Sequence, residues 1–297
     1  MAKKGLQKKT RIANKILTVV FSLVSLLYLY PLVMMVLNSF KKKAFISRAP
    51  FALPTDKMFA GLANYELGIA RTNFWGSMVW SVVITVLSVF LILLCTSMCA
   101  WFISRVVNGW TKLVYLLCIF SMVVPFQMVM FTLPKTADSL KLNTPWTIPI
   151  IYLGFGAGLA VFMFSGFVKS IPLSIEEAAA IDGASKLTIL LKIYLPISMP
   201  ALATIILFCI VNHWNDYFSG LIYMSKASMY PLQTYIQQLT VDLTQITDAD
   251  QLKQLSALNN RSFNAAKIVV STIPLLIIYP FLQKYFVTGM VIGAVKE

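Results

Sequence analysis

Long apolar stretches alternate along the chain with short segments that carry almost all of its charges. A helix that crosses the hydrocarbon core of a bilayer needs about 20 uncharged residues. Five intervals between successive charged residues meet this length, and a sixth, residues 268–283, requires the lysines on either side to reach toward the headgroups. The pattern predicts six membrane-spanning helices, near residues 16–38, 77–102, 113–134, 146–168, 198–224 and 266–286.

The composition of the 297-residue chain supports this prediction. Charged residues make up 12% of it, against about 25% in an average soluble domain, and apolar and aromatic residues make up 58%. Most of the exterior must then be apolar, which a bilayer tolerates and water does not. These values exclude an ordinary soluble protein, and the many large apolar side chains exclude a disordered chain. The expected fold class is an all-α integral membrane protein.

The net charge of +14 fits a membrane protein, because Lys and Arg at the ends of spanning helices meet anionic headgroups. Nucleic-acid binding is not expected, since no basic stripe interleaved with aromatic residues lies outside the predicted helices. An even number of spans places both termini on one side. Lys and Arg are divided almost equally between the two sides, and the basic residues within 1–15 favour cytoplasmic termini. The apolar run that follows them is too long for a cleaved signal peptide.

Two hydrophilic segments interrupt the apolar pattern, residues 39–75 and residues 225–264. Each is long enough to hold short helices or a docking surface. In the second segment we expect surface helices at 233–243 and 248–258. With cytoplasmic termini, both segments lie outside the cytoplasm, and residues 287–297 form a cytoplasmic tail.

The sequence has no pattern typical of a metal site or a disulfide framework. The only histidine, His213, has Asp216 as its one neighbour of a ligand type, so no metal and no cofactor are expected. The four cysteines all lie within apolar stretches, where we expect small buried hydrophobic residues. They are Cys95, Cys99, Cys118 and Cys209.

A charged, small-residue segment at 171–196 separates the fourth and fifth predicted spans. Ser174 and Glu177 have the spacing of a capping box, which predicts a helix that begins at Ile175. Glu176 and Glu177 would then lie in its first turn, where the helix dipole favours carboxylates. Gly183 is placed to end this helix in a left-handed conformation.

A second short helix is expected over residues 185–194, with Pro196 closing it. Helical spacing places four of its apolar residues on one face, namely Leu187, Leu190, Leu191 and Tyr194. The local pattern thus predicts an amphipathic hairpin at the membrane surface. On these grounds alone, a hairpin that only connects two spans explains the pattern equally well.

The order of residues in this hairpin carries further information. Glu177-Ala178-Ala179 is followed after three residues by Gly183 and after nine more by Ile193-Tyr194-Leu195-Pro196. This pattern resembles the EAA loop of permease subunits in bacterial ABC importers. Other segments resemble the carbohydrate-uptake branch and, within it, MalG-type permeases: VPFQ at 124–127, FMFSGFVKSIP at 162–172, EEAAAIDGAS at 176–185, PALAT at 200–204, WNDY at 214–217 and QKYFVTGMVIGAVK at 283–296.

The resemblance implies a type I ABC importer transmembrane domain, with the permease core over residues 76–286. The hairpin would be cytoplasmic and would enter a cleft on an ATP-hydrolysing subunit, with Glu177 facing a basic group there. The residues assigned to this coupling contact are Glu176, Glu177, Ala178, Ala179, Asp182, Gly183, Ile193, Leu195 and Pro196. In the tail that reaches between two ATPase subunits, the corresponding residues are Gly289, Gly293 and Lys296.

ATP hydrolysis is assigned to a partner subunit, so the chain itself is not expected to be an enzyme. It has no G-x-x-x-x-G-K-[ST] phosphate loop, and the glycines at 154, 156 and 158 lie within a predicted span without a following Lys. The partners implied by the resemblance are a second, MalF-like permease subunit, two MalK-like ATP-binding subunits and an extracytoplasmic solute-binding protein. The implied location is the bacterial plasma membrane.

Polar residues near the outer end of the fifth span are the candidates for the translocation pathway, because polar groups at membrane depth usually face a cavity or a partner. They are Asn212, His213, Trp214, Asn215 and Asp216, and Gln127 in the third span is a further candidate. Amide and carboxylate groups can bind sugar hydroxyls, and Trp can stack on a sugar ring. An alternative role for Asn215 and Asp216 is to seal a subunit interface.

Other functions remain open at this stage. An ABC permease for a non-sugar solute would differ only in its pathway residues. A secondary transporter driven by an ion gradient would need intramembrane carboxylates, of which only Asp216 is available. A membrane enzyme would need a cluster of nucleophile, base or metal ligands, which the sequence does not show.

Overall fold

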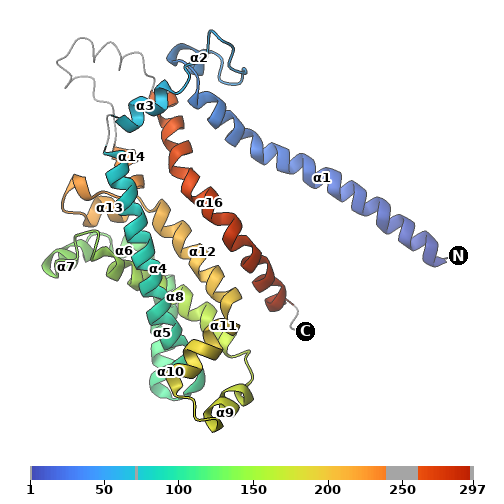
Figure 1. Ribbon diagram of the computed structural model, residues 1–297, viewed down its shortest axis with the longest axis vertical. Helices are drawn as coiled ribbons and strands as arrows, with labels where there is room; N and C mark the ends of the chain where they lie inside the picture. The colour runs from blue at the N-terminus through green and yellow to red at the C-terminus, as the bar shows by residue number, and fades with distance from the viewer. Residues whose placement is uncertain (1, 71–72, 239–259, 295–297) are drawn as a thin grey trace. The chain divides into compact units, whose positions relative to one another are not determined.

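The computed structural model describes residues 2–70, 73–238 and 260–294, and the regular secondary structure within them is helical, with one isolated bridge between Lys41 and Phe59 (Figure 1). The chain divides into two compact units. The first is drawn from residues 1–72 and 240–272, and the second from residues 73–239 and 273–297.

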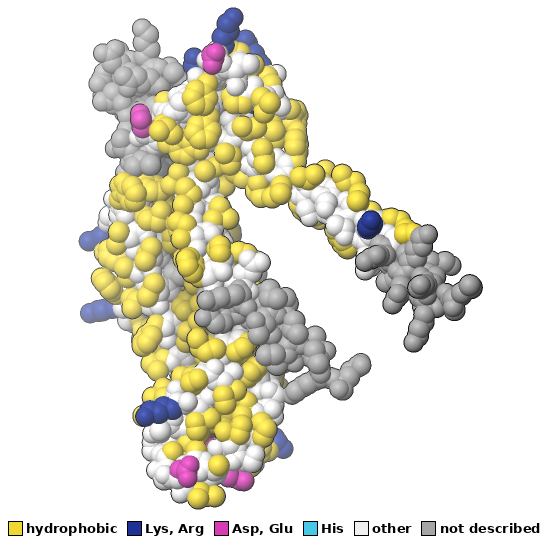
Figure 2. Space-filling view, turned by 45° about the vertical axis from the view of Figure 1, so that its right-hand side comes forward, with side chains coloured by type: hydrophobic (Ala, Val, Ile, Leu, Met, Phe, Trp, Pro, Cys, Tyr) yellow, Lys and Arg dark blue, Asp and Glu magenta, His cyan; other side chains and the backbone are white. Residues whose placement is uncertain are grey.

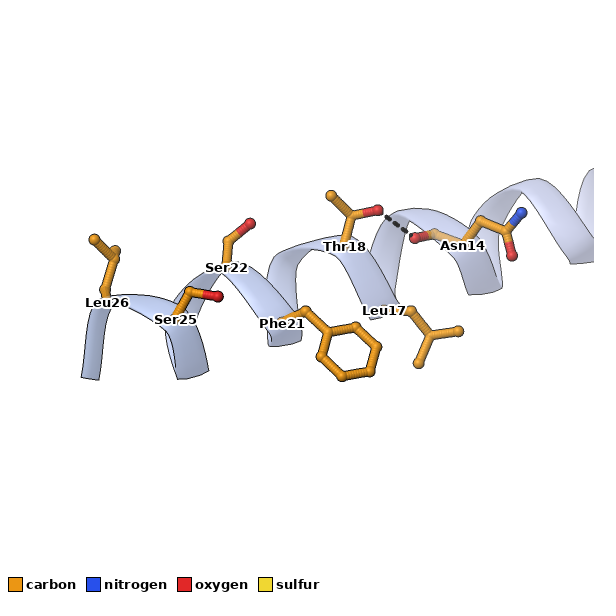
Figure 3. Close-up of a pocket in the computed structure, with 7 residues that line it drawn as sticks. All are labelled: Asn14, Leu17, Thr18, Phe21, Ser22, Ser25 and Leu26. Carbon is orange, nitrogen blue, oxygen red and sulfur yellow. Dashed lines mark hydrogen bonds between the residues drawn. The ribbon is translucent and has the colours of Figure 1, made fainter. Parts of the chain in front are cut away.

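The first unit begins with α1 (Ala2–Ser39), in which residues 12–33 are all exposed. Exposed apolar side chains along a helix of this length are compatible with lipid and not with water. One face of α1 carries a shallow hollow (Figure 3). All its lining residues belong to this one helix, so the hollow is part of a helix face and not a cavity. They are Asn14, Leu17, Thr18, Phe21, Ser22, Ser25 and Leu26.

The segment after α1 is held by backbone and side-chain hydrogen bonds and contains two short helices, α2 (Lys43–Arg48) and α3 (Ala63–Ala70). Lys41 is fully buried, and its Nζ donates to the carbonyl oxygens of Ala49 and Pro50, both at 3.0 Å. The Asn64 amide donates to the Ser39 carbonyl oxygen at 2.7 Å. A buried ammonium and a buried amide are thus both satisfied by backbone carbonyls.

The second unit is built on α4 (Phe74–Arg105) and α8 (Ile148–Val168), which pack together over the middle of the unit. Small residues line the buried face of α4 and allow close approach of its neighbours, as is usual between membrane helices. They are Ser77, Ser81, Thr85, Ser88, Thr96, Ser97 and Ala100. A core of larger side chains fills the rest, including Ile92, Val161 and Phe164.

The close contact of α8 with α5 (Gly109–Val123) depends on Gly158. A Cβ at this position would lie 2.4 Å from the Cys118 carbonyl oxygen and 2.5 Å from the Ser121 Oγ, both on α5. At Gly154, one turn earlier on α8, a Cβ would meet nothing within 4 Å. Only one of these two glycines is therefore required by packing.

The predicted third span, residues 113–134, is not one continuous helix. The helix ends at Val123, and Pro125 precedes two short helices, α6 (Phe126–Val129) and α7 (Leu133–Ser139). Pro125 has no N–H to continue the helical ladder, and it disfavours helical conformation in the residue before it. Uncharged length alone could not locate this break.

The predicted fifth span, residues 198–224, is also divided. The helix α12 (Met199–Asn215) is followed by Asp216 and Tyr217 and then by α13 (Phe218–Tyr223). The Asp216 Oδ1 accepts a hydrogen bond from the Ser219 backbone N–H at 3.1 Å, which satisfies one donor at the start of α13.

The segment after α13 contains a 3₁₀ turn (Ala227–Met229) and α14 (Leu232–Gln238), where the sequence predicts a surface helix from 233. The other predicted surface helix, 248–258, lies outside the described residues. The last helix, α16 (Asn260–Ala294), contains Pro274 and Pro280.

Three described helices are long and apolar enough to cross a membrane, Ile12–Ser39, Phe74–Arg105 and Ile148–Val168. A fourth results if Lys186–Ile197 and Met199–Asn215, which meet at 79°, count as one bent span. Two further apolar helices, Gly109–Val123 and Ala265–Phe281, are shorter. The count of six spans therefore stays a prediction.

Apolar side chains cover much of the visible surface of the second unit, while acidic side chains lie at the end where α9 is found (Figures 1 and 2).

The expectation that all four cysteines are buried is wrong for Cys95, which is exposed on α4, whereas Cys209 is buried. Cys99 and Cys118 are half-buried. A thiol can face lipid at little cost, so an apolar stretch does not decide which face of a helix a cysteine occupies.

Candidate functional site

The hairpin between α8 and α12 begins with α9 (Leu173–Ile181). The predicted capping box is wrong, since Pro172 occupies the N-cap position and Ser174 lies inside the first turn without a capping bond. The φ of Pro172, −57°, already suits a helix start, so the helix begins two residues before the predicted position. Glu176 still lies in the first turn, as expected, but the earlier helix start leaves Glu177 beyond it.

Gly183 ends α9 as predicted, with a left-handed φ of +81°. The Gly183 N–H donates to the Ala180 carbonyl oxygen, and the Ala184 N–H donates to the Ala179 carbonyl oxygen, both at 3.0 Å. This pair of bonds is a Schellman motif, which reverses the chain within two residues and satisfies carbonyl groups at the helix end.

The second arm of the hairpin starts with α10 (Lys186–Ile189), and the Ser185 Oγ accepts from the Thr188 N–H at 3.2 Å to cap it. It continues through a π-helical turn (Leu190–Tyr194) and α11 (Leu195–Ile197), one residue past Pro196. The chain then bends by 79° into α12.

The prediction that four apolar residues of this arm share one face is only partly correct. Leu190 and Tyr194 are buried, but Leu187 and Leu191 are 57% and 50% exposed. Half of the apolar stripe therefore faces outward.

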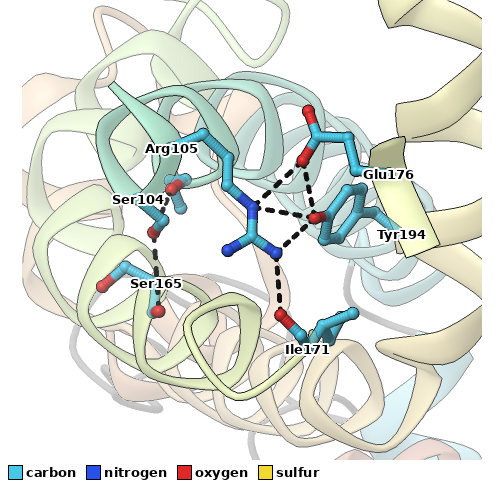
Figure 4. A network of polar contacts seen from close by, with 7 residues as sticks. Ser104, Arg105, Ser165, Ile171, Glu176 and Tyr194 are labelled. Carbon is cyan, nitrogen blue, oxygen red and sulfur yellow. Dashed lines mark hydrogen bonds and ion pairs between the residues drawn. The ribbon is translucent and has the colours of Figure 1, made fainter. Parts of the chain in front are cut away.

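A cluster of polar contacts holds the hairpin to the end of α4 (Figure 4). The Arg105 Nε lies 3.1 Å from Glu176 Oε2 and donates to the Tyr194 hydroxyl at 2.8 Å. A terminal nitrogen of the same guanidinium donates to the Tyr194 hydroxyl and, at 3.0 Å, to the Ile171 carbonyl oxygen. The Tyr194 hydroxyl in turn donates to Glu176 Oε2 at 2.8 Å. We call Arg105, Glu176, Tyr194 and the Ile171 carbonyl the Arg105 cluster.

The Arg105 cluster is largely shielded from solvent. The side chains of Arg105 and Glu176 are 16% and 20% exposed, and Tyr194 is 1% exposed. Burial raises the pKa of the Tyr194 hydroxyl, and the hydrogen bond from Arg105 opposes that shift without reversing it. The hydroxyl therefore stays protonated and able to donate at neutral pH.

Most other residues assigned to coupling lie on the outer side of the hairpin. Those that are exposed are Glu177, Ala178, Asp182, Gly183 and Pro196. Those that are half-buried, and pack against the core of α4 and α8, are Ala179, Ile193 and Leu195. In the tail, Gly289 and Gly293 belong to α16, and Lys296 lies outside the described residues.

A second feature of this unit is a cavity of about 760 Å³ beside α8, α12 and the start of α13, which we call the pathway pocket. Among the candidate pathway residues, it brings together Asn212, His213, Asn215 and Asp216. Trp214 is buried and Gln127 is exposed, and neither lines this cavity. The other lining residues are Phe126, Tyr152, Phe155, Gly156, Leu159, Ala160, Ile205, Phe208, Cys209, Val211, Tyr217, Phe218, Ser219 and Gln237.

The polar groups of the pathway pocket are only partly used by the protein. The Asn212 and Asn215 amides donate to the carbonyl oxygens of Phe208 and Val211, at 2.9 and 2.8 Å. Their side-chain oxygens take no part in these bonds. The His213 ring stacks on Tyr152 with centroids 4.4 Å apart, and its Nε2 has no hydrogen-bond partner among the described residues.

Sequence reasoning missed two parts of these sites. Tyr152 and Phe155 lie in an apolar span that gives no signal for a pocket, and Arg105 has the position of any basic residue at the end of a span. His213 belongs to the polar run that the sequence offers for the pathway, and it lines the pathway pocket.

Comparison with known proteins identifies the class of this helical membrane protein. Residues 92–292 match the family described as binding-protein-dependent transport system inner membrane component. The probable starch degradation products transport system permease protein AmyC of Thermoanaerobacterium thermosulfurigenes is 30% identical over 98% of this chain and 100% of its own length. The multiple sugar-binding transport system permease protein MsmG of Streptococcus mutans is 33% identical over 91% of this chain and 93% of its own.

The fold is also found in a solved structure. A chain of a bacterial ABC transporter involved in the import of the acidic polysaccharide alginate superposes with a TM-score of 0.78, at 28% identity, over 93% of this chain and 97% of that one. The protein belongs to the family of binding-protein-dependent transport system inner membrane components. The resemblance drawn from the hairpin and its neighbouring segments is thereby confirmed, as is the assignment to a helical membrane subunit of an ABC importer.

Proposed function

We propose that this chain forms half of the pathway of an ATP-driven importer for a sugar or oligosaccharide and couples to a separate ATPase through residues 171–196. The observation that carries the coupling role is the hairpin itself. Its inner side is fixed by the Arg105 cluster, while its outer side presents Glu177, Asp182 and Gly183. A rigid, exposed hairpin with this pattern is suited to enter a cleft on another subunit and to move with it.

The proposal includes the partners and the orientation. The other half of the pathway belongs to a second permease, two ATP-binding subunits lie on the hairpin side, and a solute-binding protein docks on the opposite side. The hairpin, residues 1–15 and the tail are then cytoplasmic, in a bacterial plasma membrane. The names of the relatives, which concern starch degradation products and multiple sugars, support the carbohydrate assignment.

The pathway pocket supports a neutral sugar as the solute. Its volume of about 760 Å³ lies within the ~300–1,000 Å³ usual for ligand sites. Aromatic rings line it together with side-chain amides and one carboxylate, and none of its described lining residues is Lys or Arg. Aromatic faces suit the apolar faces of sugar rings, and amides and a carboxylate suit hydroxyl groups. A carboxylate without a cation beside it would repel a polyuronate.

The coupling role is tested with Glu177→Ala and Gly183→Asp in the intact importer. Each should abolish uptake while the protein still reaches the membrane, because one removes the exposed carboxylate and the other places a Cβ on a left-handed residue. Asp138→Asn, which changes an exposed carboxylate outside the hairpin, should leave uptake unchanged. Normal uptake by both hairpin variants would contradict the coupling role.

The pathway role is tested with Asp216→Asn, which keeps the side-chain oxygen that accepts from the Ser219 N–H but removes the charge. Solute uptake should fall roughly tenfold, the scale of one hydrogen bond to a charged group. Co-purification of the ATPase should be unaffected.

The neutral-sugar assignment is tested by measuring whether neutral oligosaccharides or oligouronates stimulate ATP hydrolysis by the complex with its binding protein. Stimulation by oligouronates alone would overturn it.

A further inference from the structure

The Arg105 cluster joins α4 to the root and to both arms of the hairpin. Arg105 is the last residue of α4. Its guanidinium contacts Ile171 before the first arm, Glu176 within the first arm and Tyr194 within the second. One planar group with its donors in fixed directions therefore fixes the root and both arms of the hairpin relative to α4.

The donor and the acceptor of each hydrogen bond in the cluster can be assigned in only one way. Glu176 can only accept when ionised, so the Tyr194 hydroxyl donates to it, and the same hydroxyl accepts from Arg105. The ring of Tyr194 is held in addition by Arg105, whose guanidinium carbon lies 5.1 Å from the ring centroid, and by Trp101, one turn earlier on α4, at a centroid distance of 5.9 Å. The ring and the hydroxyl are both fixed by α4.

Breaking this cluster costs more than separating an exposed ion pair. Both charged side chains are at least 80% shielded, because their exposed fractions are 16% and 20%. Separation would leave a partly buried charge without its partner, which is strongly unfavourable. The hairpin and the end of α4 are therefore expected to move together.

Two other features connect the hairpin to the rest of the unit. Ile189 and Leu190 of its second arm belong to the apolar core that also contains Phe164 of α8. The same arm meets α12 at 79° at Ser198, so the Arg105 cluster is its polar link to α4. α4 packs along α8 through Ile92, Ala100 and Phe164, and α8 lines the pathway pocket with Tyr152 and Phe155. The cluster thus lies on a continuous packed route from the hairpin to the pocket.

We propose that Arg105, Glu176 and Tyr194 are positioning residues of the coupling step: they transmit displacement of the hairpin to α4, and through α8 to the pathway pocket. This proposal rests on the coupling role proposed above. It predicts that loss of the cluster raises the ATP hydrolysed per solute imported, since the hairpin could still dock and move but would be held to α4 by apolar packing alone.

The test uses the full importer in proteoliposomes, with its binding protein, and measures ATP hydrolysed and solute imported in the same sample. Arg105→Gln and Glu176→Gln should each raise the ATP hydrolysed per solute imported by about tenfold, while the ATPase still co-purifies. Lys169→Gln is the matched control. That cation, one residue beyond α8, lies over the Tyr115 ring at 5.0 Å, and its replacement should leave the ratio unchanged.

Two further variants, a charge exchange and Arg105→Lys, test whether the contact between Arg105 and Glu176 itself causes the change in the ATP-to-solute ratio. The exchange Arg105→Glu with Glu176→Arg should recover part of the coupling lost in the single variants. If Arg105→Gln fails to accumulate, Arg105→Lys keeps the charge and loses the forked contacts, and an unchanged ratio in that variant would overturn the proposal.

The outcomes also separate this proposal from the one it rests on. If the cluster variants keep the normal ratio while Glu177→Ala abolishes uptake, the hairpin couples but Arg105 does not transmit its movement. If Glu177→Ala and the cluster variants all import normally, the coupling role of the hairpin falls, and this proposal falls with it.

Discussion

The hairpin end of the second unit and the pathway pocket use polar side chains in opposite ways. In the Arg105 cluster, the guanidinium, the carboxylate and the phenol contact one another within the chain. In the pathway pocket, the side-chain oxygens of Asn212 and Asn215 take no part in the bonds that their amides make, and His213 Nε2 has no partner among the described residues. Satisfied polar groups fix one shape, whereas unsatisfied ones are available to a solute. The unit thus keeps its rigidity at one end and its binding capacity at the other.

The largest effect should come from the helix that connects these two regions. Gly158→Ala would place a Cβ 2.4 Å from a backbone oxygen of α5, which neither helix can avoid without shifting. We expect a loss of about 2 to 3 kcal/mol in the free energy of unfolding and disturbance of both regions. Thermal unfolding in mild detergent measures it, and Gly154→Ala on the same helix, with open space around it, is the control. Equal melting temperatures for the two variants would contradict this account.

An intermediate effect should separate two buried tyrosines. The Tyr194 hydroxyl has partners in the Arg105 cluster, whereas the Tyr223 hydroxyl on α13 is buried without one among the described residues. Tyr194→Phe should destabilise the protein by about 1 to 2 kcal/mol, and Tyr223→Phe should be neutral or stabilising, because an unpaired buried hydroxyl is itself costly. The same unfolding measurement decides between them. A greater loss at Tyr223 would reverse the comparison.

The smallest effect concerns pH. Burial raises the folded-state pKa of Tyr194 above its reference value of 10.0, which favours the neutral hydroxyl. The stability associated with this group is therefore fully present below the unfolded-state pKa and is lost as pH rises through the folded-state pKa. Between about pH 6 and 9, Tyr194 should contribute no slope to stability. Tyr194→Phe should remove only the part of any alkaline decline that belongs to this residue, as a series of melting curves would show.

The sequence predicted the regular parts of this molecule well. Charge spacing gave spans at 77–102 and 146–168, and the structure has helices at Phe74–Arg105 and Ile148–Val168. Gly183 was identified as a left-handed helix end, because few other residues adopt that conformation. The orientation, the number of spans and the roles of the coupling and pathway residues remain predictions.

Other features depend on contacts that no local pattern contains. Arg105 and Tyr194 are 89 residues apart, and nothing in the spacing of either one indicates the other. The predicted start of α9 was wrong because Pro172 takes the N-cap position, which places Ser174 inside the helix where its side chain makes no capping bond. Contacts between residues far apart in the sequence can be identified only in the folded structure. The same holds for the choice between two neighbouring residues that could each begin a helix.

The outward-facing apolar residues of the hairpin have a consequence for biogenesis. Ile181, Leu187 and Leu191 are 86%, 57% and 50% exposed on a segment that we propose to lie in the cytoplasm. Until a partner subunit covers these side chains, proteases that recognise exposed apolar segments can bind a newly made, unassembled copy of the chain. We therefore expect the cellular half-life of the chain to shorten when the ATP-binding subunit is absent, which a pulse-chase experiment would measure, and subunit abundance to be balanced by degradation of the excess.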